Sequence, residues 1–512
     1  MRLPLPDRFK IKYAAIFIAS LFLLQQLEGT EIIFSLLVAM YLALFVAAFN
    51  VAGGLYYASG AYIFFSGIAT AAIGLTYKAL LGQPAQSLLL TPTRTMLAYC
   101  GGMAGMGCAA FVSSRLRPKR ALLSGMAVGE QMKQAAIGCL ALAILIRSLA
   151  WSNTHETSSL ASALRQIDFF GPMAILLGTT YEITKSKGRR STNWVVWTSG
   201  LYLFFFGIVG FSKEGMFAPA NTWLIPCIVL RFNFSKRQLL GGLVAISFTL
   251  YYLVPYSQYV RNFKTETISG NAEVALHYLT DLQTTRKLYL ENTAAIDATN
   301  GSPHFFKNTE GLFDRLQMLA FDDAIIHRSE QGYTYGLLPT YQAFANVIPR
   351  VFWPNKPSFA IGNDYGRELG VISPDDTTTG ISFSPIGDAY HQAEWFGVLV
   401  VLPLVMFLFF FTSDTLTGDV RRSPWGLLTA ALAAHIAPEG LLGGTIYLAT
   451  IGSFGLVVIA LLSKYVLPKV GAIVIGGGKR TPELKVIRPL SYPGLRAGPP
   501  PVGTSDRAPV VP

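Results

Sequence analysis

The chain has 512 residues, of which 52% are hydrophobic and only 14% are charged, whereas soluble domains carry about 25% charged residues. The formal net charge is +12. Residues 261–394 nevertheless hold 10 Lys+Arg against 16 Asp+Glu, a net of −6, so the remainder carries +18. This composition excludes a protein that folds in water. Because the positive charge lies in short segments between apolar blocks, it indicates membrane topology and argues against nucleic-acid binding.

The N-terminus carries four basic residues before an apolar run at 13–24. Such a beginning resembles a signal peptide, but the following Gln25, Gln26, Leu27 and Glu28 form a poor cleavage site. Another apolar run follows at once. We therefore predict an uncleaved first membrane span.

Further apolar blocks recur along the chain at the length that a bilayer requires, about 20 residues per helix. They predict an all-α polytopic membrane protein with about 12 transmembrane helices. The predicted spans are 13–27, 32–49, 55–77, 95–114, 134–151, 167–183, 193–211, 215–230, 238–258, 395–412, 424–440 and 443–464.

The positions of the basic residues orient these spans. With a cytoplasmic N-terminus, the basic clusters at 115–120, 185–190, 231–237 and 421–422 and the basic tail all fall on the cytoplasmic side, as the positive-inside rule requires. The acidic loop falls outside. The predicted organisation has about nine N-terminal spans in 1–258, a large external loop with a helical subdomain in 259–394, about three spans in 395–464 and a disordered cytoplasmic tail in 465–512.

The four cysteines, Cys100, Cys108, Cys139 and Cys227, lie in or beside apolar blocks and not in the loop. They predict neither a disulfide framework nor a zinc site. Asp322, Asp323 and His327 allow a metal cluster, but a solvated helix face is the simpler interpretation. We expect neither a metal nor another cofactor.

Ionisable groups near the spans are candidates for function, since charges at membrane depth are costly. Lys213 and Glu214 occupy a turn between two apolar blocks, where they either contact an anion or form an ordinary interfacial turn. His435 and Glu439 are four residues apart, so on a helix they share a face and could line the same cavity.

Most candidate functional residues lie in the large loop, near its two membrane-proximal ends. Arg261 follows one span directly, and the proline-stiffened segment 348–357 holds Arg350, Trp353 and Lys356. Arg and Lys bind phosphates, and aromatic rings give sugars a flat apolar surface. The segment 378–391, which contains Tyr390, leads into the next span. Its Asp388 and His391 are three residues apart and could orient or deprotonate a sugar hydroxyl.

The string Pro349–Pro357, with Arg350, Trp353 and Lys356, resembles the large periplasmic loop of the bacterial O-antigen or oligosaccharide repeat-unit polymerases. The segments 362–365, 377–384 and 387–390 follow in that family's order, although Asp388 stands where glutamate is commoner. The turn at 212–215 also resembles the family's basic turn, and the likeness extends over nearly the whole chain.

This resemblance implies a GT-C-like enzyme of the bacterial inner membrane that transfers a glycan from undecaprenyl diphosphate onto a new lipid-linked repeat unit. We expect Lys213, Arg261 and Arg350 to bind the donor diphosphate, with support from Lys356. Trp353 and Tyr390 are expected to contact the substrate. Asp388 or His391 is expected to activate the acceptor. A chain-length regulator is a possible partner. An O-antigen ligase and a flippase-type transporter are the alternatives, although the chain shows no clear internal repeat of the transporter kind.

Overall fold

The computed structural model describes the chain except residues 1, 4, 5, 127, 128, 153–168, 266, 301, 309, 311, 312, 349–351, 354, 357–359, 378 and 475–512. Within this described part every regular element is a helix, and a single isolated bridge joins Phe383 to Gly440. The all-α prediction is therefore confirmed there.

The first half of the chain forms the helices α1 (Ile11–Leu27), α2 (Ile32–Ala52), η1 (Gly54–Tyr56), α3 (Ala58–Gly67), η2 (Ile68–Ala72), α4 (Ile73–Leu80), α5 (Pro92–Leu116), α6 (Glu130–Ser152), α8 (Phe170–Lys185), α9 (Trp194–Val209), α10 (Lys213–Val229), α11 (Lys236–Phe248), η3 (Thr249–Leu253), α12 (Val254–Val260) and η4 (Arg261–Phe263).

The loop region forms α13 (Ile268–Leu279), α14 (Leu282–Asn300), η5 (Phe313–Arg315), α15 (Leu319–Glu330), α16 (Leu338–Ala345) and α17 (Ile361–Glu368). The C-terminal part forms α18 (Pro385–Phe396), η6 (Gly397–Val401), α19 (Leu402–Thr417), α20 (Pro424–Glu439), α21 (Leu441–Tyr447), η7 (Leu448–Gly452), α22 (Ser453–Tyr465) and α23 (Leu467–Val474).

Six helical stretches of the described part are long and apolar enough to cross a membrane, which indicates a membrane protein. They are Ile32–Tyr56, Ala58–Leu80, Pro92–Leu116, Lys236–Phe263, Pro385–Thr417 and Leu441–Tyr465. Ile11–Leu27 and Trp194–Val209 are shorter apolar helices. Each predicted span coincides with a helix, but the structure supports six of them as spans by length and composition.

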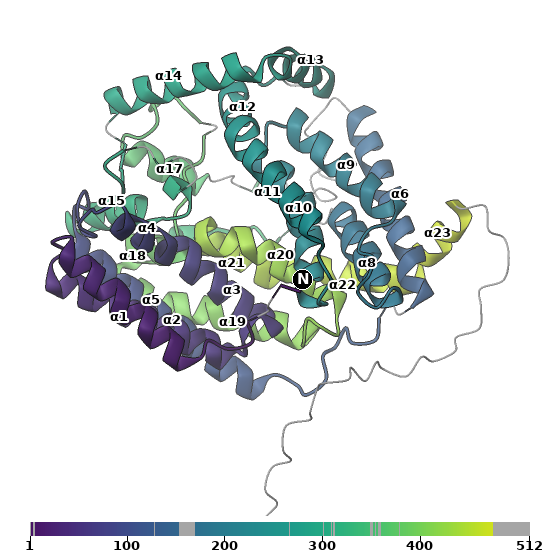
Figure 1. Cartoon of the computed structure of the whole chain (residues 1–512), viewed down its shortest axis with the longest axis horizontal. Helices are drawn as coiled ribbons and strands as arrows, with labels where there is room; N and C mark the ends of the chain where they lie inside the picture. The colour runs from purple at the N-terminus through teal and green to yellow at the C-terminus, as the bar shows by residue number, and fades with distance from the viewer. Residues whose placement is uncertain are drawn as a thin grey trace, which may run out of the picture.

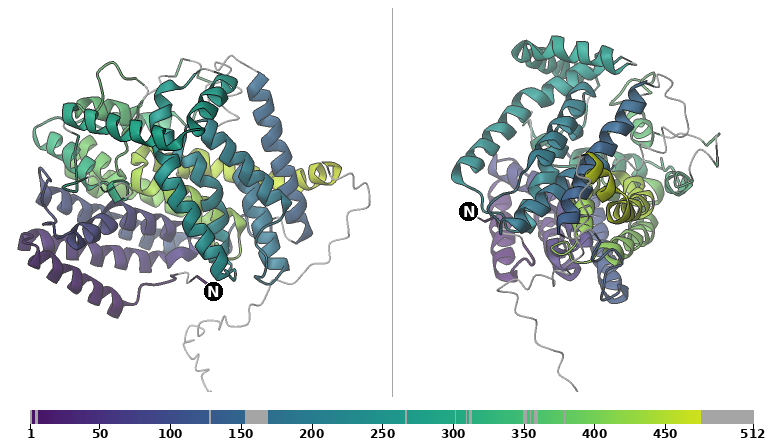
Figure 2. Two further views of the ribbon diagram at one scale, coloured as in Figure 1. Left: turned by 45° about the horizontal axis from the view of Figure 1, so that its top comes forward. Right: turned by 90° about the vertical axis from the view of Figure 1, so that its right-hand side faces the viewer.

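The helices form two bundles with separate apolar cores. The first bundle packs α2, α3, α5, α18, α19 and α21 around one core, and the second packs α6, α8, α20, α22 and α23 around another. Figures 1 and 2 show α1, α2, α5 and α19 side by side, with α6, α8 and α9 in the other group. Leu432 and Tyr447 contact both cores, so α20 and α21 join the bundles.

The loop region divides into a cap and an inserted part. Helices α13 and α14 lie across the top of the molecule in Figure 1, and α14 packs on α12. Both elements are helices, as a helical subdomain in this loop requires. In contrast, α15 packs between α5 and α18 with most of its side chains buried. The loop is therefore partly built into the first bundle.

Two C-terminal features refine the predicted boundaries. Within α18, Ala393 and Glu394 leave helical geometry, with φ of 47° at Glu394, so the helix bends where the predicted span begins. Beyond the bend the chain doubles back so closely that a Cβ on Gly397 would lie 1.8 Å from the Ala389 carbonyl oxygen. The predicted disordered tail is wrong for Leu467–Val474, because α23 is a helix packed on α6.

Candidate functional site

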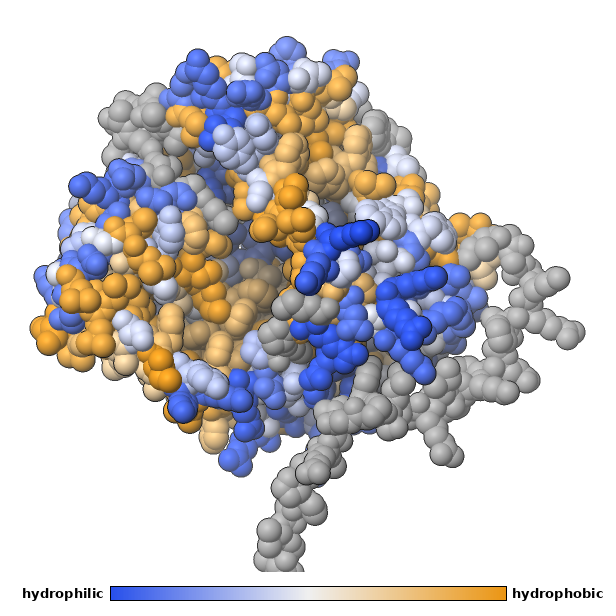
Figure 3. Space-filling model, in the orientation of Figure 1, coloured by the Kyte–Doolittle hydropathy of each residue, from blue (hydrophilic) through white to orange (hydrophobic). Residues whose placement is uncertain are grey.

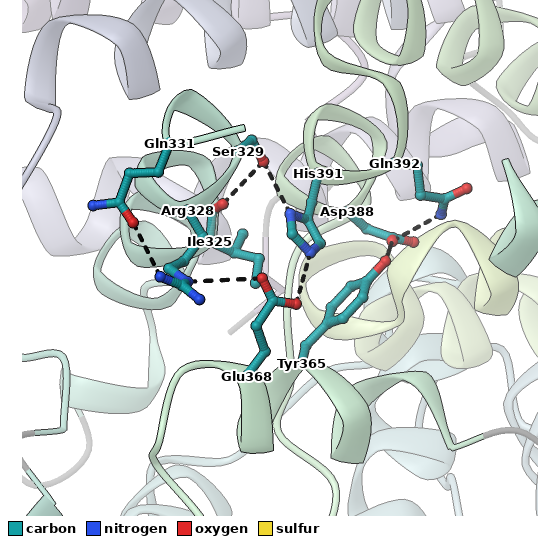
Figure 4. A network of polar contacts seen from close by, with 9 residues as sticks. All are labelled: Ile325, Arg328, Ser329, Gln331, Tyr365, Glu368, Asp388, His391 and Gln392. Carbon is teal, nitrogen blue, oxygen red and sulfur yellow. Dashed lines mark hydrogen bonds and ion pairs between the residues drawn. The ribbon is translucent and has the colours of Figure 1, made fainter. Parts of the chain in front are cut away.

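Asp388 is the centre of a buried polar network, which we call the Asp388 network (Figure 4). Its Oδ1 accepts hydrogen bonds from the Tyr365 hydroxyl at 2.9 Å and from the Gln392 amide at 2.8 Å, and its Oδ2 accepts one from the Leu442 backbone N–H at 2.8 Å. The residue is 1% exposed. A buried carboxylate must be satisfied by donors, and these three donors join α17, α18 and α21.

His391 lies one turn further along α18, and its ring meets the same Tyr365 ring edge-on at 4.7 Å. Its Nδ1 lies 2.9 Å from the Ser329 hydroxyl and its Nε2 lies 3.1 Å from Glu368 Oε2. Since an ionised carboxylate only accepts, Nε2 carries a proton. Asp388 and His391 therefore both lie on α18 and both contact Tyr365, as their spacing of three residues on a helix allows.

Ser329, His391 and Glu368 resemble the arrangement of a nucleophile, a base and an orienting acid. However, the Ser329 hydroxyl also lies 3.1 Å from the Ile325 carbonyl oxygen of its own helix. Ser329 and His391 are 1% and 0% exposed. Both groups are enclosed by protein, so the arrangement supports a link between helices rather than a nucleophile.

Two further carboxylates, Asp322 and Asp323, fix the same junction from α15. Asp323 accepts from Thr91 N at 3.0 Å and from the Thr95 hydroxyl at 2.7 Å, and it thereby satisfies donors at the start of α5. Asp322 accepts from the Tyr99 hydroxyl at 2.6 Å and from Ser384 N at 3.0 Å. Burial raises the pKa of Asp322 to about 7.

Both interpretations of Asp322 and Asp323 from the sequence were therefore wrong. The two residues are 0% and 1% exposed, so they are not on a solvated face. No group of three or more possible metal ligands occurs among the described residues. The contact with Asp322 also explains why a glycine stands at the start of the segment 387–390: a Cβ on Gly387 would lie 2.5 Å from the Asp322 carboxyl carbon.

Among the other loop residues expected at the site, Lys356 and Tyr390 bond to groups of the protein itself. The Lys356 ammonium donates to the carbonyl oxygens of Asn346 at 3.1 Å and Ile348 at 2.9 Å, and the residue is 6% exposed. The Tyr390 hydroxyl donates to Glu330, which pairs with Arg94 at 3.1 Å. Trp353 is half-buried. Arg350 lies outside the described residues.

A second cluster is partly open to solvent, and we call it the cationic cluster: Lys213, Arg261, Arg315, His435 and Glu439. Burial and the nearby charges of Arg315 and Arg261 together lower the pKa of Lys213 to about 8, while Glu439 opposes this shift. These charges therefore lie close together, although they come from α10, η4, η5 and α20. Sequence reasoning had linked Lys213 with Arg261, but it missed Arg315.

Local structure explains how Lys213 and Arg261 meet. Ser212 caps α10 by accepting from Gly215 N at 3.1 Å, so Lys213 is its first residue. The preceding Phe211 has a φ of 52°, and the Arg261 guanidinium donates to its carbonyl oxygen at 3.2 Å. Arg315 donates to Gln258 on α12 at 2.8 Å. Each arginine is thus tethered by one hydrogen bond and is otherwise exposed.

His435 and Glu439 form the acid–base part of the cationic cluster. His435 Nδ1 lies 2.7 Å from Glu439 Oε1, and its Nε2 lies 3.5 Å from Glu214 Oε2. The side chains of His435 and Glu439 are 44% and 31% exposed. The helix face predicted for this pair is confirmed, and unlike His391 the pair can meet a substrate.

The cationic cluster lies where the two bundles meet. Helix α20 belongs to the second core and contacts α10 and α3. Figure 3 shows a hollow near the centre of one face of the molecule, with apolar side chains on much of its wall, and Figure 1 shows α20 and α21 near the centre of the same view. Cations beside an apolar recess could bind a ligand with both an anionic group and a lipid chain.

Fold and composition thus define an all-helical protein whose apolar helices indicate a membrane location. Residues 56–417 match a family model described as a domain of unknown function, DUF8712, and the chain belongs to this family. No curated protein and no solved structure matches the chain. The matched range contains Lys213, Arg261, Arg315 and the whole Asp388 network except Leu442, but it ends before His435 and Glu439.

Proposed function

We propose that the chain is a glycosyltransferase of the bacterial inner membrane that polymerises lipid-linked oligosaccharides on the periplasmic side. The sugar hydroxyl of a new repeat unit attacks the anomeric carbon of the growing glycan. The bond from that carbon to the undecaprenyl diphosphate breaks, and the hydroxyl proton passes to a base. The proposal rests on the resemblance of the loop motifs and on the convergence of three cations beside an exposed acid–base pair.

The cations suit the leaving group. A departing diphosphate gains negative charge, and fixed positive groups stabilise that charge in the transition state. Lys213, Arg261 and Arg315 come from three separate elements, so their convergence does not follow from local sequence. An arginine also offers a planar fork that matches phosphate oxygens.

For the base we favour His435 over the residues expected from the sequence. Glu439 orients the imidazole through Nδ1, which leaves Nε2 to accept the hydroxyl proton once the exposed Glu214 side chain moves aside. Asp388 and His391 are enclosed, so we assign them a positioning role for the helices that frame the recess.

The test is polymerisation in nanodiscs with undecaprenyl-diphosphate-linked repeat units from the bacterium that encodes the chain. We expect Arg261→Ala and Arg315→Ala to lower the initial rate of polymer formation about 100-fold, as losses of charge stabilisation do. Lys264→Ala removes an exposed cation three residues from Arg261 and should leave the rate unchanged. Activity should persist in a chelator, because no metal is invoked.

Two outcomes would reject the polymerase. Transfer of glycan to a lipid A-core acceptor, with no lengthening of lipid-linked chains, would identify a ligase. Movement of the lipid-linked unit across the bilayer without any new glycosidic bond would identify a transporter.

A further inference from the structure

Helix α16, in the loop region, turns its apolar side chains outward and its polar side chains inward, which is the reverse of a helix on the surface of a soluble domain. Its outward side chains are Leu338, Tyr341 and Phe344, which are 54%, 66% and 40% exposed. Its inward side chains are Thr340 and Gln342, which are 9% and 7% exposed. A helix exposed to water places its polar side outward, so another medium is expected to cover this face.

The inward side of α16 is fixed by specific contacts. The Thr340 hydroxyl donates to Gln392 Oε1 on α18 at 2.6 Å, and Gln392 in turn bonds to Asp388. Helix α16 also packs on α21, where a Cβ added to Gly443 would lie 3.7 Å from the Ala343 side chain. The polar side of α16 is therefore held by the first bundle, and this orientation is not an accident of a loosely attached loop.

The chain around α16 extends the same apolar surface. Tyr333, Leu337, Val347, Ile348 and Phe352 are all large exposed apolar side chains. The sequence from Gln331 to Pro349 contains no charged residue. Such a large exposed apolar patch marks an interaction site.

The position of α16 indicates what covers its outward apolar face. It packs on α21, the first helix of the candidate span Leu441–Tyr465. Further along that span, Phe454 and Leu461 are also exposed, as lipid-facing side chains are. The outward face of α16 thus continues the apolar surface of a membrane-spanning element at that element's end. Tyrosines gather at this depth of a bilayer, where their rings meet both chains and headgroups.

We propose that the outward face of α16 lies in the lipid interface of the bilayer, as an amphipathic helix parallel to the membrane plane. Lipid covers Leu338, Tyr341 and Phe344. The loop is therefore anchored to the membrane between its two ends, and α16 carries this anchor directly to α18 and the Asp388 network. This inference does not depend on the proposed enzymatic activity.

The test uses a fluorophore sensitive to polarity, attached to single cysteines in the full chain in nanodiscs. Cys108 is the exposed cysteine of the four, so Cys108→Ser provides the background. Labels go on Tyr341→Cys and Phe344→Cys, and the control is Ser373→Cys, an exposed polar loop position. Two labelled positions guard against failure of one variant to fold.

We expect the labels at 341 and 344 to emit at shorter wavelength than the control. Nitroxide-bearing lipids should quench them several times more strongly than iodide in the water does, and the label at 373 should show the reverse. Equal iodide quenching at 341, 344 and 373 would overturn the proposal. Protection from iodide without quenching by lipid, appearing only in discs with two copies, would also overturn it and identify a protein interface.

Discussion

The Asp388 network and the cationic cluster both gather charged side chains from distant parts of the chain, yet they differ in how completely those charges are used. Asp388 accepts three hydrogen bonds and is 1% exposed. The His435 side chain is 44% exposed, and one of its two carboxylate partners lies at 3.5 Å. Buried polar groups whose hydrogen bonds are all made within the protein stabilise its structure, whereas exposed groups that can form further hydrogen bonds are able to bind a ligand.

The comparison also separates two readings of a sequence motif. Asp388 lies in one of the segments that resemble a polymerase and His391 directly follows that segment, and their residue types suit acid–base chemistry. Their contacts show that the same residue types equally suit a buried junction of α15, α17, α18 and α21. Motif residues thus identify a region, while accessibility decides which groups in it can touch substrate.

Removal of the central carboxylate should produce the largest effect. Asp388→Ala leaves the Leu442 N–H, the Tyr365 hydroxyl and the Gln392 amide without their acceptor inside the protein. We expect a loss of about 3–5 kcal/mol in the free energy of unfolding, as for a broken buried polar network. It is measured as a fall in the melting temperature in detergent.

Asp388→Asn is the matched control for that experiment. It keeps one acceptor oxygen and the side-chain volume, so it should lie between the wild type and Asp388→Ala in stability. If Asp388→Ala melts with the wild type but loses polymerisation, the Asp388 network is catalytic and the comparison between the two regions fails.

The next effect is the pH dependence contributed by Asp322. Burial raises its pKa from 3.8 to about 7. Between these values the folded protein binds the proton and the unfolded chain has released it, so stability falls as pH rises. The contribution is fully present below pH 3.8 and is lost by about pH 7, a change of about 2–4 kcal/mol.

Asp322→Asn tests this directly, because the amide keeps the size of the side chain and cannot ionise. Relative to the wild type, the variant should gain stability as the pH rises from about 4 to about 7, with midpoints taken from thermal melts across that range. Parallel melting curves at all pH values would show that Asp322 has an ordinary pKa in the folded protein.

How far the sequence alone could predict this structure depends on the range of the interactions involved. Helix positions were predicted well because apolar length is a local property: each predicted span coincides with a helix, although only six stretches of the described part are long and apolar enough to cross a membrane. The Ser212 cap and the shared face of His435 and Glu439 are also local. The prediction of a disordered tail was wrong at α23, because this helix is ordered by packing on α6, more than 300 residues earlier in the chain.

The contacts that define the sites are long-range. Asp322 and Asp323 resemble a solvated pair in the sequence, and only their contacts with α5 and Ser384 reveal them as buried. Arg315 stands in a segment without a motif, and it joins Lys213 through the packing of η5 near α12. A useful signal was present in the apolar residues around Asp322, which are typical of a buried helix.

The cationic cluster should respond in the opposite way to the Asp388 network. His435→Ala removes an exposed group with bonds to spare, so we expect unfolding to change by less than about 0.5 kcal/mol. Under the proposed function, the initial polymerisation rate should fall about 100-fold, as when a general base is lost. Both quantities are measured on the same nanodisc preparation.

Glu439→Gln is the graded companion of His435→Ala. The amide oxygen can still accept from His435 Nδ1–H, but it no longer stabilises the imidazolium, so the rate should fall less than in His435→Ala. A variant pair that melts early and loses activity in proportion would place His435 among the structural groups instead.

The smallest expected effect concerns Lys356, which the motif predicted to bind phosphate. Its ammonium already donates to two backbone carbonyl oxygens, so it holds the segment after α16 in place. Lys356→Met keeps most of the aliphatic stem and removes the charged donor. We expect a loss of about 1–2 kcal/mol in stability, typical of hydrogen bonds from a charged group, and a Michaelis constant for the lipid-linked donor that is unchanged. A rise in that constant with the melting temperature preserved would show that Lys356 leaves its carbonyl partners to bind the diphosphate. Lys356 would then be a ligand-binding residue, as proposed for Lys213.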